Sequence, residues 1–301
     1  MRIFVTGATG YIGSAVLDAL VRAGHDVTAL VRHNEEAARV AARGAHPVIG
    51  DLGDPESYRS PADAQDGYVH TAFEASGRGQ AVDRVAIETM IAAAKQPRPS
   101  ATRFVIYTSG VWVLGRTGEP AAEDAPLNPI TLVSWRPAHE QLVLDAASDQ
   151  LRAVVVRPGI VYGGGNGIVS ELFESALNGL VRVVGDGNNH WPLVYLRDLA
   201  DLYTRLASQP DASGVYHATD EGDERVNGIV AAISRYLQVQ PDVRHVPIDE
   251  ARSQMGPYAD ALALDQIVRS PRAHALGWTP TLHSVAGNAV RLLEELEASQ
   301  D

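Results

Sequence analysis

A glycine-rich turn near the start of the chain constrains the fold more than any other feature. The apolar run Arg2–Thr6 is typical of a buried strand, and a G-x-x-G-x-x-G pattern follows it at Gly7, Gly10 and Gly13. A helical pattern then continues to Val21. Glycines let the chain turn sharply and let a pyrophosphate approach the backbone, while the helix N-terminus supplies N–H donors. The pattern predicts a dinucleotide-binding turn, with an ordinary strand-to-helix turn as the alternative.

Short β-rich runs alternate with helical patterns over the first half of the chain. The predicted strands are Arg2–Thr6, Asp26–Val31, His46–Ile49, Gly67–Ala72, Thr102–Tyr107 and Arg152–Arg157. Continuous apolar strands suit a parallel sheet that is buried on both faces, and helices between them imply right-handed crossovers. The predicted fold class is therefore α/β, with a doubly wound parallel sheet of the Rossmann type.

The rhythm changes after Gly159, where glycine-rich turns at 163–165 and 185–187 separate short strands and helices. We expect a Rossmann domain over residues 1–160 and a smaller, discontinuous C-terminal substrate-binding lobe over 161–301. A helix near Arg197–Ser208 and a strand near Gly214–Ala218, within the segment 195–220, are expected to return to the main sheet. The amphipathic stretch Leu282–Ala298 predicts a final surface-packed helix.

Composition narrows the functional classes. The 301 residues carry a formal net charge of −12 and include no cysteine. The acidic balance disfavours nucleic acid and anionic membranes as partners, and the missing cysteines exclude disulfides and suit a reducing, cytoplasmic setting. No secretory signal, membrane-spanning run, histidine motif for a metal or Gly-x-Ser-x-Gly elbow is found. We expect a soluble protein that acts on a small molecule and holds no metal.

Arg32 predicts which dinucleotide is bound. An NAD site would place an acidic residue at the end of the second strand to hold the ribose diol, but this chain has Arg32 there. A guanidinium can pair with the 2′-phosphate of NADP(H) and stack on adenine. The prediction is NADP(H); a solvated surface arginine is the alternative. Glu35 and Glu36 follow, as is common in the first turn of a helix.

Seven segments spread over nearly the whole chain carry a family resemblance. They are Thr6–Gly13, Gly50–Leu52, His70–Ala72, Tyr107–Gly110, Arg157–Gly163, Trp191–Leu202 and Leu276–Pro280. With them the chain resembles the extended and atypical short-chain dehydrogenase/reductases, which include nucleotide-sugar epimerases and many ketone reductases and contain the NAD-dependent epimerase/dehydratase type. Together with the motifs above, the resemblance implies cofactor contacts from Gly7, Ala8, Thr9, Gly10, Tyr11, Ile12, Gly13, Arg32, Asp51, Leu52, Ala72, Phe73, Thr108, His139, Pro158 and Ile160.

The catalytic motif of this family is only partly present. The family uses a serine after the fifth strand and a Tyr-x-x-x-Lys on the next helix. Ser109 matches the serine, whereas Trp135 and His139 stand where the tyrosine and lysine would be. The serine hydroxyl can stabilise charge on a carbonyl oxygen, and imidazole can donate a proton or bond the nicotinamide ribose. The alternatives are a turn-capping serine, a packing tryptophan and a spectator histidine.

The leading hypothesis is an NADPH-dependent reductase that acts on the carbonyl of a small, largely apolar substrate. The expected catalytic residues are Ser109, His139 and Trp135, and the expected substrate contacts are Trp112, Tyr162, Trp191 and Tyr195. Tyr107, Tyr162 and Tyr195 are other sources of a phenol, although core packing is the default for each. An epimerase, isomerase or cyclase and a non-catalytic NADP(H)-binding redox sensor remain open. The resemblance also implies a homodimer through helices near Arg84–Lys95 and Ala138–Ala147.

Overall fold

The computed structural model describes residues 1–96 and 103–299. The chain divides into two compact units. The first comprises Met1–Ser109, Trp135–Arg157 and Leu199–Tyr216. The second comprises Gly110–Ser134, Pro158–Asp198 and His217–Asp301.

One seven-stranded sheet forms the centre of the first unit, with the strand order β3-β2-β1-β4-β5-β6-β11. The strands are β1 (Arg2–Thr6), β2 (Asp26–Val31), β3 (His46–Ile49), β4 (Gly67–His70), β5 (Arg103–Thr108), β6 (Leu151–Pro158) and β11 (Gly214–Ala218). Neighbouring strands from β3 to β6 are parallel. This is the order of a doubly wound dinucleotide-binding sheet, so the predicted fold class is confirmed. The strand order reverses between β1 and β4, where such folds bind their ligands.

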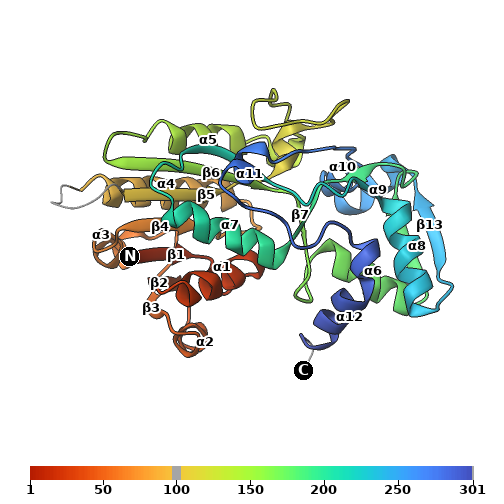
Figure 1. The fold of residues 1–301 in the computed structure, drawn as a ribbon, viewed down its shortest axis with the longest axis horizontal. Coiled ribbons are helices and arrows are strands. Elements are labelled where there is room, and N and C mark those ends of the chain that lie inside the picture. The colour runs from red at the N-terminus through yellow and green to blue at the C-terminus, as the bar shows by residue number, and fades with distance from the viewer. Residues whose placement is uncertain (97–102, 300–301) are drawn as a thin grey trace. The chain divides into compact units, whose positions relative to one another are not determined.

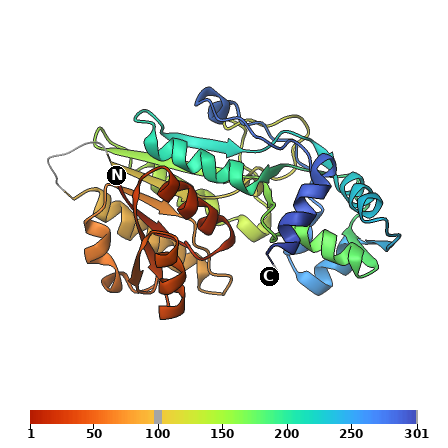
Figure 2. The same ribbon diagram turned by 60° about the horizontal axis from the view of Figure 1, so that its bottom comes forward.

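Helices cover both faces of the sheet. They are α1 (Tyr11–Arg22), α2 (Asn34–Ala42), α3 (Arg59–Asp63), α4 (Gly79–Ala94), α5 (Arg136–Leu144) and α7 (Leu196–Ser208), with a 3₁₀ turn at Pro55–Ser57. Figures 1 and 2 show α4 and α5 along one face and α1 and α7 along the other. Under α4 and α5 lies an apolar core that includes Phe4, Tyr68, Ile87, Met90, Val105, Val143 and Val155.

The C-terminus of α4 is held by a buried arginine from the next strand. The Nη1 atom of Arg103 donates to the carbonyl oxygens of Ala93 and Ala94 at 3.0 and 2.7 Å. A cation is favourable there because the last carbonyls of a helix lack intrahelical partners. This contact fixes α4 against β5, and α4 also carries Asp83, a central residue of the site described below.

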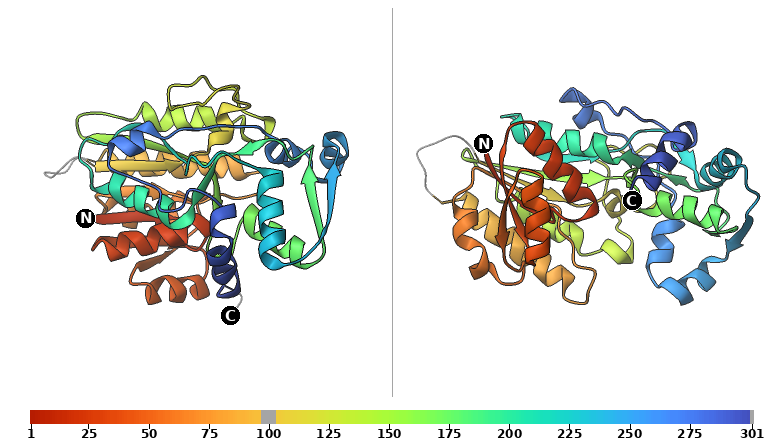
Figure 3. Two further views of the ribbon diagram at one scale, coloured as in Figure 1. Left: turned by 45° about the vertical axis from the view of Figure 1, so that its right-hand side comes forward. Right: turned by 90° about the horizontal axis from the view of Figure 1, so that it is seen from below.

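The second unit is built from short elements. They are the 3₁₀ turns Val111–Leu114, Thr131–Val133 and Ala286–Asn288, the strands β7 (Ile160–Tyr162), β8 (Leu180–Val184), β9 (His190–Trp191), β10 (Leu193–Tyr195), β12 (Glu224–Arg225) and β13 (Asp242–Val246), and the helices α6 (Ile168–Leu177), α8 (Val226–Leu237), α9 (Ile248–Met255), α10 (Tyr258–Leu262), α11 (Pro271–Ala275) and α12 (Ala289–Glu297). Strand β7 pairs with β10, β8 with β13, and β9 with β12. Side chains of α6, α8 and α12 share one core, and Figure 3 shows these helices from two directions.

The predicted element bounds are correct for β1, β2, β3 and β11, but three others need correction. Strand β6 covers Leu151–Pro158 and is one residue longer at each end than the predicted Arg152–Arg157. Strand β4 ends at His70 instead of Ala72, because the N–H and hydroxyl of Thr71 both bond the carbonyl of Thr6 and the chain then leaves the sheet. Strand β5 runs to Thr108, and Thr102 of the predicted strand lies outside the described residues.

The last helix begins later than the sequence predicts. Glu224 accepts hydrogen bonds from the hydroxyl of Ser284 and from the N–H groups of Val285 and Ala286. These contacts hold a separate 3₁₀ turn, so α12 starts only at Ala289. Among residues 1–96 and 103–299, no helix is both long and apolar enough to cross a membrane.

Candidate active site

The glycine turn after β1 is packed so closely that side chains are excluded. Gly7 has a φ of +77°, and a Cβ there would lie 2.6 Å from the nitrogen of Ala72. At Gly13 a Cβ would lie 2.0 Å from the Gly7 carbonyl oxygen and 2.5 Å from Oγ1 of Thr71. The residue before α1, Gly10, has no side chain to cap the first turn of the helix. The turn therefore offers the close backbone and the N–H donors that a pyrophosphate needs.

A pocket of about 380 Å³ opens at this turn, within the first unit. The predicted cofactor residues that line it are Gly7, Thr9, Gly10, Tyr11, Ile12, Arg32, Asp51, Leu52, Ala72 and Phe73. Its lining also includes Leu30, Val31, Glu36, Gly50, Thr71 and Glu74, which sequence reasoning did not assign. Ala8 and Gly13 are buried in the turn instead, and Thr108, His139, Pro158 and Ile160 are not part of this lining. The pocket lies where a doubly wound sheet binds a dinucleotide.

Arg32 and Glu36 both line the pocket, just after the end of β2. The Glu36 carboxylate accepts hydrogen bonds from the backbone N–H groups of Arg32 and His33, at 2.9 and 3.2 Å. Burial raises the pKa of Glu36, but these hydrogen bonds outweigh that effect, and the net pKa lies below its ordinary value. The Arg32 guanidinium is exposed and makes no hydrogen bond or ion pair within the described part of the chain. The pocket thus holds a free cation beside an ionised carboxylate.

Asp51 is engaged in a local turn. Its Oδ1 atom accepts the N–H of Gly53 at 2.7 Å, and its Oδ2 atom lies 3.9 Å from Nη2 of Arg78. Asp51 therefore caps a turn and lines the pocket at the same time.

Ser109 directly follows β5, and its hydroxyl is unpaired. The residue is 7% exposed and its N–H donates to the carbonyl of Val156 at 2.8 Å, but the Oγ atom is buried and has no partner in the described residues. A buried polar atom without a partner costs stability and needs an explanation, such as a ligand that completes its bonding. Its neighbour Thr108 is different, because Oγ1 of Thr108 lies 2.5 Å from the hydroxyl of Tyr203.

Trp135 is part of an aromatic cluster at the start of α5. Its ring stacks on Phe73 with a centroid distance of 6.2 Å and an interplanar angle of 9°. The guanidinium of Arg136 lies 4.5 Å from the Trp135 ring centroid and 5.5 Å from that of Phe73. His139 meets the Trp135 ring edge-on at 4.8 Å. The spacing of four residues thus places Trp135 and His139 on one helix face, as expected.

His139 is held by an acidic residue that sequence reasoning did not single out. The Nδ1 atom of His139 lies 2.6 Å from Oδ2 of Asp83, and both side chains are buried. Oδ1 of Asp83 bonds Nε2 of His70 at 3.1 Å, and Tyr107 donates its hydroxyl proton to Oδ2 at 3.1 Å. Burial raises the pKa of Asp83, but hydrogen bonds from His139 and His70 outweigh it and hold the pKa well below its ordinary value. Asp83 is therefore a buried, ionised carboxylate.

The tyrosines considered as proton donors are engaged elsewhere. Burial raises the pKa of Tyr107, whose hydroxyl is bonded to Asp83. Burial also raises the pKa of Tyr162, whose hydroxyl donates to Asp220 at 3.0 Å. The pKa of Tyr195 is raised to about 12, mainly by burial, and its hydroxyl donates to Glu295. All three residues are at most 1% exposed. A phenol that is buried and paired with a carboxylate is a poor source of a proton.

The remaining predicted substrate contacts lie in the core of the second unit. Trp191 is 4% exposed and donates Nε1–H to the carbonyl of Leu262 at 3.0 Å. Trp112 is half-buried and packs edge-on against Tyr258, with ring centroids 6.5 Å apart. Both tryptophans have structural contacts, and their assignment to substrate binding stays a prediction.

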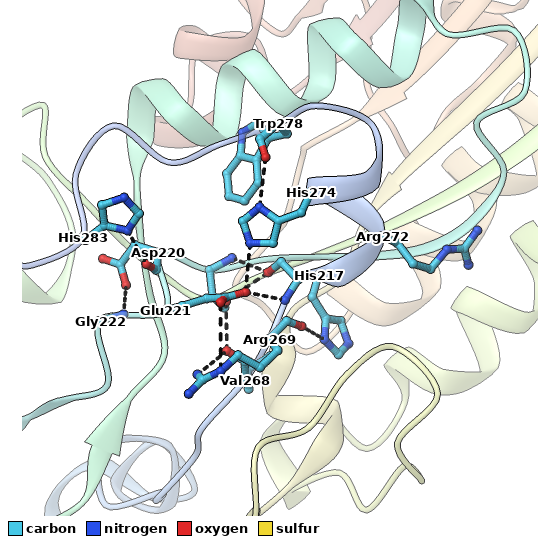
Figure 4. A network of polar contacts seen from close by, with 12 residues as sticks. His217, Asp220, Glu221, Gly222, Val268, Arg269, Arg272, His274, Trp278 and His283 are labelled. Carbon is cyan, nitrogen blue, oxygen red and sulfur yellow. Dashed lines mark hydrogen bonds and ion pairs between the residues drawn. The ribbon is translucent and has the colours of Figure 1, made fainter.

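An acidic loop after β11 forms a polar network in the second unit (Figure 4). The Glu221 carboxylate accepts the N–H of Ser270 at 2.8 Å and lies 3.1 Å from Nε2 of His274, and Arg269 forms a two-point ion pair with Asp223. Burial raises the pKa of the neighbouring Asp220 to about 7. In residues 1–96 and 103–299 no three His, Asp or Glu side chains are grouped to hold a metal ion.

Comparison with known proteins identifies the family. The model of the NAD dependent epimerase/dehydratase family matches residues 3–219. The chain belongs to this family. The resemblance to short-chain dehydrogenase/reductases is thereby confirmed, and a nicotinamide cofactor is supported for the pocket.

Three similar proteins each match most of the chain. An uncharacterized protein of Schizosaccharomyces pombe is 34% identical, over 93% of this chain and 95% of its own. A 4-hydroxy-2-methyl-3-oxo-4-farnesyl-3,4-dihydroquinoline-1-oxide ketoreductase of Stigmatella aurantiaca is 28% identical, over 84% of this chain and 78% of its own. The solved structure of human epimerase family protein SDR39U1 with NADPH has a TM-score of 0.77 and 20% identity, over 98% and 99% of the two chains. The solved structure supports the fold, and the relatives support an atypical oxidoreductase.

Proposed function

We propose that this protein is an NADP(H)-dependent reductase that acts on the carbonyl group of a small, largely apolar molecule. The observation that carries the proposal is the hydroxyl of Ser109, which is buried and unpaired at the carboxyl end of β5. A donor of this kind can hydrogen-bond the carbonyl oxygen of a substrate and stabilise the negative charge that develops there. A similar ketoreductase in the family supports the same reaction.

The pocket residues fit a dinucleotide. The turn Gly7–Gly13 would hold the pyrophosphate, since a Cβ at Gly7 or Gly13 would fill the space that the close backbone requires. The exposed guanidinium of Arg32 would pair with a 2′-phosphate, which supports NADP(H) over NAD(H). When bound, the reduced nicotinamide supplies a hydride.

His139 supplies the proton in this proposal. Its Nδ1 atom is bonded to Asp83, whereas its Nε2 atom makes no hydrogen bond to the described residues. An imidazole oriented in this way can hold and release a proton at Nε2. Because Tyr107 is bonded to the same carboxylate and buried, it is the weaker candidate.

The test is reduction of a panel of ketones by the purified full chain with NADPH, measuring both NADPH oxidation and alcohol formation. We expect equal amounts of each, and a loss of about 10²-fold in kcat for Ser109→Ala, as for other removed oxyanion donors. Ser253→Ala, an exposed serine on α9, is the control and should behave like the parent.

Three results would contradict the proposal. Product formed without net NADPH oxidation would indicate an epimerase, isomerase or cyclase instead. Turnover by Ser109→Ala at the parent rate would show that the Ser109 hydroxyl takes no part in the reaction. A protein that binds NADPH but reduces no ketone in the panel would favour the non-catalytic, redox-sensing alternative.

A further inference from the structure

A buried chain of hydrogen bonds connects the glycine turn to His139. Oγ1 of Thr6, the residue before the turn, lies 2.6 Å from Nδ1 of His70. Nε2 of His70 lies 3.1 Å from Asp83 Oδ1, and Asp83 Oδ2 lies 2.6 Å from Nδ1 of His139. The side chains of His70, Asp83 and His139 are 1%, 3% and 9% exposed. Water is therefore largely excluded from these contacts, which makes each of them electrostatically stronger.

The chemistry of the partners fixes the direction of these bonds. Arg136 can only donate, so the oxygen of Tyr107 accepts from its Nη1 atom at 3.1 Å. The single hydroxyl proton of Tyr107 is then given to Asp83. Because Asp83 is ionised, it can only accept, and each histidine must present an N–H to it. His139 therefore carries a proton on Nδ1, and its Nε2 atom is left to gain or lose the second proton.

We infer that Asp83 is a positioning residue, which sets the tautomer and ring orientation of His139 through the bond to Nδ1. The inference rests on the proposed function for its catalytic consequence, because it makes Nε2 of His139 the atom that exchanges a proton with the substrate. His70 and Thr6 hold the second carboxylate oxygen of Asp83 in place. Asp83 itself touches neither substrate nor cofactor in this scheme; it acts through the imidazole.

The expected effect follows from the role of such carboxylates. The hydrogen bond at one imidazole nitrogen determines which nitrogen carries the proton, so a neutral amide in place of Asp83 no longer requires Nδ1–H. In the proposed reduction Nε2 gives its proton to the substrate oxygen and is left without one, so the proton that remains on the ring must be on Nδ1, where Asp83 accepts it. A ring whose remaining proton is no longer held on Nδ1 is therefore a poorer proton donor at Nε2. General acid–base assistance is commonly a factor of about 10²–10⁴ in rate, so we expect Asp83→Asn to lower kcat by about 10²-fold or more.

The experiment combines NMR with kinetics. Long-range ¹H–¹⁵N spectra of the full chain with ¹⁵N-labelled histidine report the tautomer, and His139→Phe identifies the signals of His139 among the ten histidines. We expect Nδ1–H in the parent and a shift towards Nε2–H in Asp83→Asn, with NADPH affinity retained. Glu88→Gln is the control because it also converts a carboxylate of α4 to an amide, at an exposed site, and should change neither tautomer nor kcat.

A double variant separates positioning from general structural damage. If Asp83 acts through His139, Asp83→Asn should cost nothing further in kcat once His139→Phe is present. An equal loss in both backgrounds would overturn the inference, as would an unchanged tautomer in Asp83→Asn. If Asp83→Asn fails to fold, the NMR spectrum of the parent still tests the inference, because a neutral His139 with its proton on Nε2 would overturn it. A parent that shows the expected tautomer but reduces no ketone contradicts the proposed function and leaves the positioning intact.

Discussion

Replacing Arg32 by glutamine is the most direct test of cofactor choice. The guanidinium is exposed and makes no hydrogen bond or ion pair within residues 1–96 and 103–299, so its removal breaks no side-chain contact of the free protein. The backbone N–H of Arg32, which donates to Glu36, remains in the variant. A change in cofactor affinity would therefore report on the cofactor and not on lost folding stability.

The size of the effect follows from the exposure of Arg32. A hydrogen bond to a charged group contributes about 1.5–3 kcal/mol, and solvent screening at an exposed site favours the lower end. Removal of the guanidinium should then cost about 1.5 kcal/mol, or about tenfold in the Kd for NADPH. The Kd for NADH should not change, because NADH has no 2′-phosphate. High salt should reduce the difference between the two cofactors in the parent.

Calorimetric titration of the parent and Arg32→Gln with NADPH and NADH measures the ratio. Arg22→Gln is the control, because it removes the same charge from the exposed end of α1, outside the pocket. Equal affinities for NADPH and NADH in the parent would refute the reasoning. So would a ratio in Arg32→Gln that is the same as in the parent.

Three further predictions concern other features of the structure. Glu36→Gln keeps an oxygen that can accept the backbone N–H groups but removes a negative charge from the pocket beside Arg32. NADPH, with its 2′-phosphate, should then bind about threefold tighter, whereas the Kd for NADH should not change; calorimetric titration measures both. Gly13→Ala should lower the free energy of unfolding by about 1–3 kcal/mol and weaken NADPH binding. A Cβ at Gly10 would lie 3.2 Å from its nearest neighbour, the Gly7 carbonyl oxygen, so Gly10→Ala should lower the free energy of unfolding less; denaturant titrations measure both. Burial raises the folded-state pKa of Asp220 to about 7, so this carboxyl favours folding when protonated and parent stability should fall as pH rises from about 4 to 7. In thermal unfolding curves recorded across this pH range, Asp220→Asn should lose the part of the stability decrease that Asp220 causes. An Asp220→Asn variant with the same pH dependence as the parent would contradict this prediction.

The sheet could be predicted from the sequence because its strands are continuous apolar runs. Arg2–Thr6 and Asp26–Val31 begin and end where the apolar pattern does, and glycines mark the turn between β1 and α1. Helix α12 shows the limit of this approach. The amphipathic pattern from Leu282 is real, but a carboxylate distant in sequence, Glu224, captures the backbone at Val285 and shifts the start of the helix.

The site shows the same division between local and distant signals. The glycine turn and Ser109 could be found because each is tied to the end of a strand. Asp83 and Glu36 could not, because an acidic residue on a helix is usually a solvated one and nothing near Asp83 in the sequence indicates burial. Only the packing of α4 against β4 and α5 shows that Asp83 meets both His70 and His139.

Charge balance around Asp83 explains how a histidine can stand where the family has a lysine. A buried carboxylate is stable only when it is paired, and a fixed cation would normally provide the pairing. Here Arg136 is the fixed cation, because it lowers the pKa of Asp83 through its charge and reaches the carboxylate through the hydroxyl of Tyr107. His70 and His139 bond the same carboxylate, and these two hydrogen bonds are the largest effects that lower the pKa of Asp83. Because only Nδ1 of His139 is bonded to Asp83, Nε2 would be the atom that exchanges a proton with the substrate in the proposed reductase.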